Sequence, residues 1–418
     1  MGLRLPDWRK EEPTIDEVIK RHPKVPSFVI LKTDLLRRGY VLTEAAEAVL
    51  DPKIHQTGIK WIFGESARST PAGLLLRDGT TVVGGHRDLI NTDIRDPWVI
   101  DVVNGRLVAT DQGKVYEEVE YWPRPSYYDF TTSKGNPAWS ILGARPSRLE
   151  FTPNSHCHFW DKPGGGCKYC TVGAIASENR KKNVSARIDL DELVETVAEA
   201  LKQKGRFTDL CATAGSILSG KELLDDEVDL YVEAFKKLRT LFKTDFIRLQ
   251  LVGTAYNRRQ LERLRDEGGL RAYTTDIEVL DKQIFEWVCP GKAEFIGYEG
   301  WKQSLYQAVE VFGKGNVNAG FVGGVDLAQP HGHKSEVDSL AANFAEAEEL
   351  AKHGVSVVNS VWMVGDNTVF KNQVPPSLDY YVRLAEGLND IRDAYGITVY
   401  HDDYRRCGNH PPSDLARI

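Results

Sequence analysis

The sequence lacks long apolar runs, and no uninterrupted stretch approaches the roughly 20 residues that a bilayer-spanning helix needs. Its first residues, Met1 to Trp8, lead straight into charged residues without the apolar core of a signal peptide. An excess of positive charge is also missing, since 53 Lys and Arg stand against 60 Asp and Glu, for a net charge of −7. An acidic surface attracts neither nucleic acid nor an anionic membrane. We therefore expect a cytoplasmic protein that binds neither.

Cysteine is scarce, with six residues in 418. Thiols stay reduced in the cytoplasm, which excludes a disulfide framework and favours metal or cluster ligation. A composition of 41% hydrophobic and 27% charged residues supports a substantial core and excludes a disordered chain or a coiled coil. The length fits an α/β barrel of roughly 250 residues with an added module.

Residues 1–145 form the added module in this interpretation. The pattern there is irregular and typical of an α+β fold, and no motif indicates its role. The expected elements are helices over 15–20 and 34–50 and hairpins around Asp78-Gly79 and Asn104-Gly105. A connector rich in proline and aromatic residues, at 122–128, closes the module.

Residues 146–400 instead alternate short β-like runs with amphipathic helices. The expected strands are 148–152, 209–214, 246–252, 272–279, 316–322 and 355–363, and the expected helices are 190–201, 222–242, 258–267, 300–312, 335–353 and 378–395. Six βα units in series predict a parallel α/β sheet, either open or closed into a full or partial barrel. Residues 401–418 are expected to form a tail that closes the barrel.

Polar residues recur at every second position of three expected strands. They are Arg248 and Gln250, then Thr274, Asp276 and Glu278, then Asn316 and Asn318. The face of a parallel sheet that helices cover must be apolar, so these side chains should point to the other face. This pattern favours a barrel that encloses a polar cavity over one filled with apolar side chains.

Three of the six cysteines, Cys157, Cys167 and Cys170, lie within fourteen residues, directly after the first strand of the βα series. The loop contains Gly164–Gly166, which lets the backbone fold closely around a metal centre. A structural zinc site would take a fourth ligand from His156 or His158. A [4Fe–4S] cluster would leave one iron open for a substrate or cofactor. Chance clustering of buried cysteines is the third interpretation.

A cluster of three cysteines after the first strand of a (βα)6 series, ending in Cys-x-aromatic-Cys, resembles the radical S-adenosylmethionine (SAM) superfamily. The family's usual spacing is three residues and then two, whereas this sequence has nine and then two. The resemblance covers about residues 146–400 and implies a partial (βα)6 barrel. It implies that Cys157, Cys167 and Cys170 bind the cluster and that Tyr169, just before the last cysteine, contacts the adenine of SAM.

Other parts of the family pattern have counterparts further along the chain. Thr213, Ala214, Gly215 and Ser216 follow the second strand, where the family binds the SAM amino group. The stretch 320–326 resembles the family's adenine-packing segment, and Asp276 and Glu278 lie on strand four, where a polar residue touches SAM. A Cys-Pro-Gly-Lys run at 289–292 is similar to the biotin-synthase-like branch. By resemblance, the SAM contacts are Tyr169, Thr213, Ala214, Gly215, Ser216, Asp276, Glu278, Gly320, Val322 and Gly324.

The remaining candidates carry weaker patterns. Cys211, Cys289 and Cys407 are isolated, so burial is expected for each. His331 and His333 follow the fifth strand, and a polar run at 401–404 begins the tail. The sequence has neither a cysteine-rich C-terminal extension nor the Asp-x-His-x-x-Gly motif of cobalamin-binding enzymes.

The resemblance implies an enzyme that reductively cleaves SAM to a 5′-deoxyadenosyl radical, which abstracts hydrogen from a small-molecule substrate in a biosynthetic or cofactor pathway. Its electron donor would be ferredoxin or flavodoxin. Arg248 and Gln250 are the expected substrate contacts, since Arg248 can grip a carboxylate or phosphate. Two alternatives stay open: transfer of another SAM fragment, such as a 3-amino-3-carboxypropyl or methyl group, and a zinc-stabilised binding module without activity.

Overall fold

The computed structural model describes residues 8–57, 60–61, 64–65, 70–83, 96–173, 185–242, 248–365, 367–398, 410–411 and 415. In this part of the chain, no helix is long and apolar enough to cross a membrane. Cys407 and the polar run at 401–404 lie outside the described residues, as do positions 246 and 247 of the expected third strand.

The N-terminal region contains a six-stranded sheet in the order β1-β6-β7-β8-β4-β5. Its strands are β1 (Tyr40–Leu42), β4 (Gly73–Leu76), β5 (Thr81–Val83), β6 (Trp98–Val103), β7 (Arg106–Asp111) and β8 (Lys114–Tyr121), and a separate pair joins β2 (Lys60–Trp61) to β3 (Gly64–Glu65). The predicted hairpins are confirmed as β4–β5 and β6–β7. Asn104 and Gly105 have φ values of 50° and 75°, the left-handed pair that a tight hairpin turn requires.

The helix expected over 34–50 is wrong. Three separate elements occupy the segment: the end of α3 (Ser27–Arg38), strand β1, and α4 (Glu44–Ala48). Gly39 ends α3 with a φ of 70°, and Thr43 begins α4 by accepting a hydrogen bond from the backbone N–H of Ala46. The apolar spacing runs through both boundaries, so periodicity alone did not reveal the break. The preceding helices are α1 (Trp8–Glu11) and α2 (Ile15–Arg21).

A second, seven-stranded sheet follows in the order β15-β14-β13-β12-β11-β10-β9. Its strands are β9 (Leu142–Ala144), β10 (Arg148–Phe151), β11 (Asp209–Thr213), β12 (Arg248–Gly253), β13 (Ala272–Glu278), β14 (Val317–Gly323) and β15 (Ser356–Val361). The strands from β10 to β15 are parallel, and β9 pairs antiparallel with β10. Their bounds agree with the six predicted strands to within about two residues wherever the chain is described.

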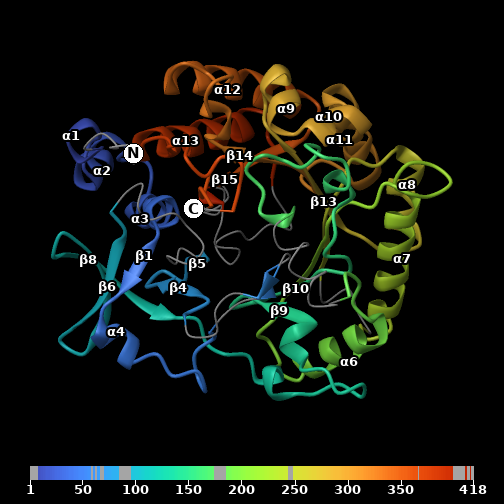
Figure 1. Ribbon diagram of the computed structural model, residues 1–418, viewed down its shortest axis with the longest axis horizontal. Coiled ribbons are helices and arrows are strands. Elements are labelled where there is room, and N and C mark those ends of the chain that lie inside the picture. The colour runs from blue at the N-terminus through green and yellow to red at the C-terminus, as the bar shows by residue number, and fades with distance from the viewer. Residues whose placement is uncertain are drawn as a thin grey trace.

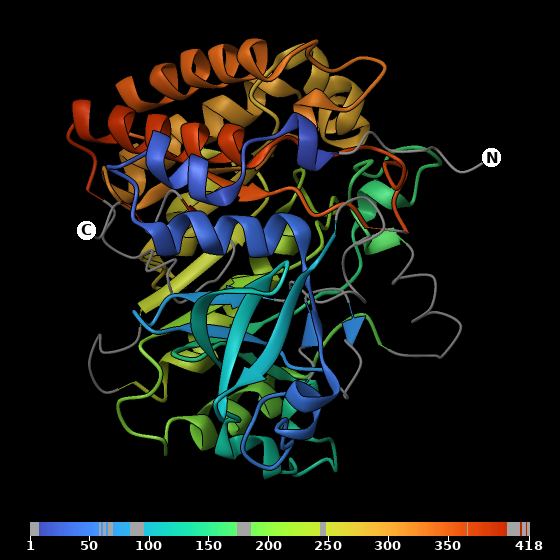
Figure 2. The same ribbon diagram turned by 90° about the vertical axis from the view of Figure 1, so that its left-hand side faces the viewer.

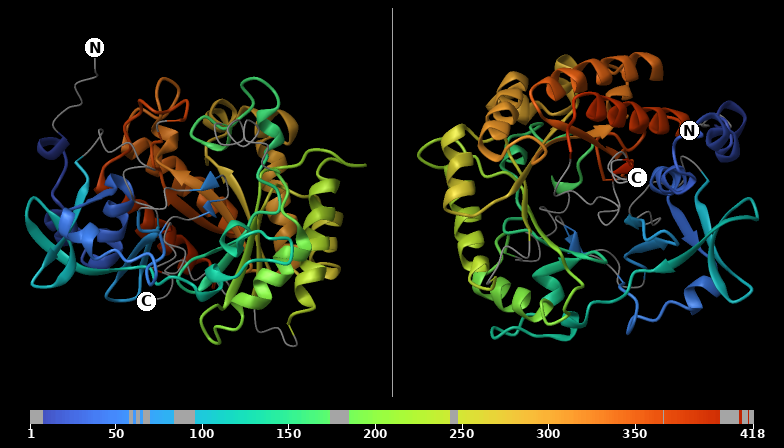
Figure 3. Two further views of the ribbon diagram at one scale, coloured as in Figure 1. Left: turned by 60° about the horizontal axis from the view of Figure 1, so that its bottom comes forward. Right: turned by 180° about the vertical axis from the view of Figure 1, so that it is seen from behind.

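Helices cover the outer face of this sheet, which curves into part of a barrel (Figures 1 and 3). They are α6 (Leu190–Ala200), α7 (Asp225–Arg239), α8 (Arg258–Asp266), α9 (Lys282–Val288), α10 (Pro290–Phe295), α11 (Tyr298–Phe312), α12 (Glu336–Lys352) and α13 (Leu378–Ala394). Strand β13 shows how the layers divide. Tyr273 points outward and stacks on Phe312 of α11, with ring centroids 6.1 Å apart, while Thr274 faces the interior cavity.

The N-terminal region fills the gap between the two ends of the curved sheet (Figures 1 and 2). On one side α3 packs on β15 and α13, and on the other side β2 contacts β9. His22, which follows α2, bonds to Asp379 and Glu386 of α13 at 3.2 and 3.1 Å. The α+β region therefore completes the wall that the six parallel strands leave open.

Candidate functional site

One cavity of about 350 Å³ occupies the interior of the curved sheet. The cysteine loop after β10 forms part of its wall, as do residues from β11 to β15. The following residues that we selected from the sequence line it together: Cys157, Cys167, Tyr169, Cys170, Thr213, Ala214, Gly215, Ser216, Gln250, Asp276, Glu278, Gly320 and Val322. The polar interior that the alternating strands predict is thus confirmed for Gln250, Thr274, Asp276 and Glu278.

Two residues that we selected from the sequence, Arg248 and Gly324, lie outside the cavity lining, so these two site predictions are corrected. Arg248 is the first residue of β12, at the end of the strand opposite the cysteine loop, and its side chain is exposed. Gly324 has a φ of 91°, and a Cβ there would lie 2.6 Å from Pro376, so it turns the chain away from β14. The lining of the cavity includes neither residue.

The cysteine loop folds around the indole ring of Trp160. A short 3-10 helix (His158–Trp160) begins at Cys157 and places this ring inside the loop. A Cβ on Gly166 or on Gly173 would lie 2.3 Å from ring atoms of Trp160, far closer than carbon atoms can approach. Glycine at both positions therefore lets the loop close, and this packing explains how the long first interval still brings Cys167 and Cys170 back to Cys157.

Backbone contacts tie the same loop to the barrel on two sides. The N–H of His158 donates to the carbonyl of Ser216 at 2.9 Å, and a Cβ on Gly215 would lie 2.2 Å from the carbonyl oxygen of His156. On the other side the N–H of Gly291 donates to Gly165 at 2.8 Å, and the N–H of Lys168 donates to Val288 at 3.0 Å. The loop is thus attached to the segment that follows β11 and to the junction of α9 and α10.

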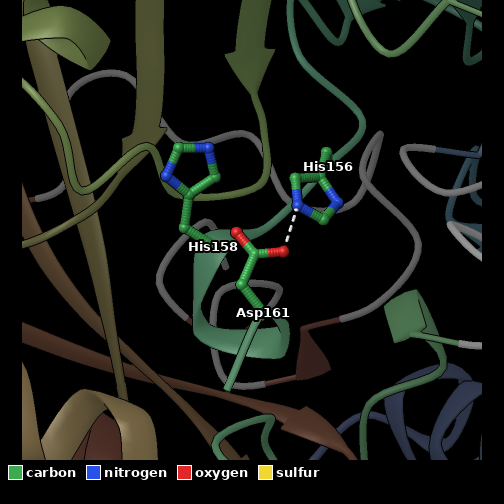
Figure 4. A group of neighbouring side chains, drawn as sticks. All are labelled: His156, His158 and Asp161. Atoms are coloured by element: carbon green, nitrogen blue, oxygen red, sulfur yellow. Dashed lines mark hydrogen bonds and ion pairs between the residues drawn. The ribbon is translucent and has the colours of Figure 1, made fainter. Parts of the chain in front are cut away.

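His156 and His158 lie near Asp161 (Figure 4). Potential ligand atoms of these three residues lie within 4.8 Å of one another. His156 Nε2 pairs with Asp161 Oδ1 at 2.7 Å, while His158 Nδ1 accepts a hydrogen bond from the N–H of Leu218 at 3.1 Å. These bonds order the loop and leave neither imidazole in the cavity lining, so the structure does not assemble a zinc site from one histidine and the cysteines.

The spacing of the three cysteine sulfurs also bears on the metal. Within the described residues, the histidine–aspartate group is the one set of three side chains whose ligand atoms lie mutually within 4.8 Å. At least one pair among the sulfurs of Cys157, Cys167 and Cys170 therefore lies more than 4.8 Å apart. A tetrahedral zinc ion with bonds of about 2.3 Å needs sulfurs about 3.8 Å apart. Wider spacing suits ligands that bind three different irons of one cluster.

Burial controls the ionisation of these thiols. It raises the pKa of Cys157 to about 11 and that of Cys170 well above its usual range. Cys167 differs, because a hydrogen bond from the thiol of Cys289 lowers its pKa. Cys289 is fully buried, as expected, but its contact with Cys167 is not evident from the sequence. A metal centre that binds these cysteines has to displace their protons, as thiolate ligation always requires.

Two carboxylates, Asp276 and Glu278, stand at the end of β13 with an irregularity in strand pairing between them. Glu278 has a φ of 72°, a left-handed conformation that costs a non-glycine residue about 1 kcal/mol. A Cβ on Gly320 would lie 2.0 Å from Asp276 Oδ1, so the glycine opposite makes room for this carboxylate. Backbone strain at a cavity wall is typical of a functional position.

We predict that the Asp276 carboxyl makes the free energy of unfolding depend on pH. Burial and the nearby charge of Glu278 raise its pKa to about 7. The folded state therefore favours the protonated form, and stability is lost as the pH rises from the unfolded value near 4 through 7. Between pH 4 and pH 8, the stability of Asp276→Asn should increase relative to that of the wild type by on the order of 4 kcal/mol.

Urea unfolding of the metal-free chain at a series of pH values measures this difference. Asp229→Asn is the matched control, since Asp229 lies exposed on α7. It should show the pH dependence of the wild type. Identical pH dependence in the wild type and in Asp276→Asn would contradict the prediction.

The cavity also includes charged residues that we did not select from the sequence. Arg148 and Glu150 face it from β10, together with Arg145, Lys292 and His410. Arg145 donates to Glu150 at 2.6 Å. Arg148 and Glu150 alternate with Leu149 and Phe151, so the two-residue period that we applied to later strands marks them too. Arg148 replaces Arg248 as the candidate for a carboxylate or phosphate contact.

Residues that follow β14 form a buried hydrogen-bond network beside the cavity. Asp326 accepts hydrogen bonds from Ser339 at 2.6 Å and Asn343 at 3.1 Å and is absent from the described cavity lining. His333 lies 3.8 Å from the same carboxylate, and the ring of His331 meets that of Trp287 edge-on. These contacts give His331 and His333 a role in packing beside the site.

Comparison with known proteins gives no match to any protein-family model and no match among curated proteins. Similar solved structures include methylornithine synthase, at 13% identity over 60% of this chain and 70% of that chain, with a TM-score of 0.42. A radical SAM methyltransferase from Sphaerobacter thermophilus is 14% identical over 96% of this chain and 98% of that chain, with a TM-score of 0.38. A zinc-containing amidohydrolase from Burkholderia multivorans follows at 12% identity over 59% and 87%, with a TM-score of 0.26. None of these likenesses assigns an activity to this chain.

Proposed function

We propose that this chain is a radical SAM enzyme of the cytoplasm. In this proposal Cys157, Cys167 and Cys170 hold a [4Fe–4S] cluster, and the cavity beside them holds SAM and a small-molecule substrate. The observation that carries the proposal is the convergence of these three thiols and Tyr169 on one cavity inside a curved parallel sheet. At least one sulfur–sulfur separation above 4.8 Å and the glycine-containing loop around Trp160 support a cluster over a single zinc ion.

The remaining walls divide between cofactor and substrate. Residues from β11, β13 and β14 lie within the same cavity as the cysteines and are the proposed SAM contacts: Thr213, Ala214, Gly215, Ser216, Asp276, Glu278, Gly320 and Val322. Gln250 and Arg148 lie on the strands that line the rest of the cavity and are the proposed substrate contacts. A protein of this kind positions the reacting groups and keeps water away from them.

A cluster held by Cys157, Cys167 and Cys170 would supply an electron, taken from reduced ferredoxin or flavodoxin, for the reductive cleavage of SAM that would start hydrogen abstraction from the substrate. The residues of this chain set where that occurs. The loop holds Tyr169 beside the cysteines, and the two carboxylates on β13 line the same cavity. The biotin-synthase-like branch is the nearest in motif, through the Cys-Pro-Gly-Lys run at 289–292.

Iron analysis tests the proposal. The chain, reconstituted anaerobically with iron and sulfide, is expected to bind about four irons and to absorb broadly near 400 nm, as such clusters do. A chain that takes up one zinc ion and no iron would contradict it and would support a zinc-stabilised module. The alternative activity, transfer of another SAM fragment, keeps the same cluster and is recognised by the SAM-derived product.

A further inference from the structure

Lys292 is a buried cation of the cavity wall to which the proposed function gives no role. It lies in the first turn of α10, and its side chain is 11% exposed. It lines the same cavity as the cysteines and the two carboxylates of β13. A buried ammonium group is costly unless charged or polar partners surround it, so its partners indicate its purpose.

Three groups fix the ammonium of Lys292. Its Nζ donates to the backbone carbonyl of Asp276 at 2.7 Å and to Oε1 of Glu278 at 2.6 Å. It also lies 4.6 Å from the ring centroid of Trp301, over the face of the indole. The bond to Glu278 helps to hold that residue in its left-handed conformation. The charge therefore has a fixed position rather than the mobility of a surface lysine.

The cysteine loop lies on the other side of the same segment. Gly291, the residue before Lys292, donates its N–H to the carbonyl of Gly165 at 2.8 Å. The thiol of Cys289 donates a hydrogen bond to the sulfur of Cys167. The positive charge of Lys292 is close enough to act on the thiols of both Cys157 and Cys167, where it favours the thiolate. Lys292 thus stands between the proposed cluster ligands and the proposed SAM contacts.

We propose that Lys292 is a positioning residue whose fixed charge raises the reduction potential of the cluster held by Cys157, Cys167 and Cys170. This inference rests on the proposed function. Reduction adds one negative charge to a cluster, and a cation held nearby in a medium of low dielectric constant stabilises that charge. The neighbouring carboxylate of Glu278 acts in the opposite direction. Removing Lys292 therefore takes away a positive charge and also leaves Glu278 without its cation.

Redox titration of the reconstituted holoprotein, followed by electron paramagnetic resonance without SAM, tests this inference. In Lys292→Met the ratio of reduced to oxidised cluster at a fixed potential should fall at least tenfold, which is a shift of about 59 mV for a one-electron couple. Lys292→Arg keeps the charge and should stay within threefold of the wild type. The double variant Lys292→Met/Glu278→Gln removes both charges and should recover most of the lost ratio, which a merely structural role would not produce.

The outcomes separate the two claims. A wild-type chain that forms no cluster overturns the proposed function and this inference with it. A wild-type cluster whose potential is the same in Lys292→Met, with full iron content, overturns the inference and leaves the proposed function intact. If Lys292→Met does not fold, the comparison of Glu278→Gln with the wild type decides, because removing that negative charge should raise the reduced fraction. An unchanged or lower fraction in Glu278→Gln overturns the inference.

Discussion

Replacing Cys167 by Ala is expected to reduce the iron content of the reconstituted chain from about four per chain to background, with loss of the absorbance near 400 nm. Cys157→Ala and Cys170→Ala should have the same effect. Each removes one of the three proposed ligands, which line the cavity from the loop, and thiolate–iron bonds would hold the whole cluster. Iron and sulfide analysis after anaerobic reconstitution and gel filtration measures the loss.

Two other buried cysteines provide matched controls. Cys211 lines the cavity from β11, and the thiol of Cys289 is hydrogen-bonded to the sulfur of Cys167. Neither lies in the loop, so Cys211→Ala and Cys289→Ala should keep iron at the level of the wild type. Loss of iron in Cys289→Ala together with full iron in Cys157→Ala would contradict the ligand set and place Cys289 within it.

The second large effect is expected from Gly166→Ala. The new methyl group would lie 2.3 Å from the indole of Trp160, and that ring cannot retreat because Gly173 packs on it equally closely. Overpacking of a tight site costs about 1–3 kcal/mol. Because the strain falls between Cys157 and Cys167, the loop should open and the iron content should fall by more than half.

A control and a rescue distinguish this cause from a general effect of the methyl group. Gly365→Ala adds a methyl group near Thr171 with nearest contacts at 3.4 Å, an ordinary distance, and should keep full iron content. In Gly166→Ala, the further change Trp160→Phe makes room and should restore part of the iron. Full iron content in Gly166→Ala, measured in the same way, would show that Trp160 does not define the loop.

The strands of the barrel were predictable because a buried parallel strand has a simple pattern. Apolar residues must cover the helix-facing side, as Tyr273 does against α11, and the polar residues between them then mark the cavity. The error over 34–50 has an equally local cause. Gly39 and Thr43 act as a stop and a start signal, yet three strand residues between them keep the apolar spacing of a helix.

The sequence predicted those site residues that lie within one segment or follow the two-residue period of a strand. The period of two identifies which residues alternate, but it does not tell which side chains reach the cavity. Arg148 and Arg248 each begin a strand and lie in register through Asp209, yet Arg148 lines the cavity and Arg248 is exposed. Lys292 depends on the approach of α10 to the end of β13, a contact between segments that no local pattern encodes. The hydrogen bond between the thiols of Cys167 and Cys289 likewise joins two separate segments of the chain.

The most direct test of the account is the fate of SAM. The reconstituted chain, incubated anaerobically with dithionite and SAM and analysed by mass spectrometry, is predicted to release 5′-deoxyadenosine and methionine, while Cys167→Ala releases neither. A chain that contains zinc but no iron and leaves SAM intact would contradict the account.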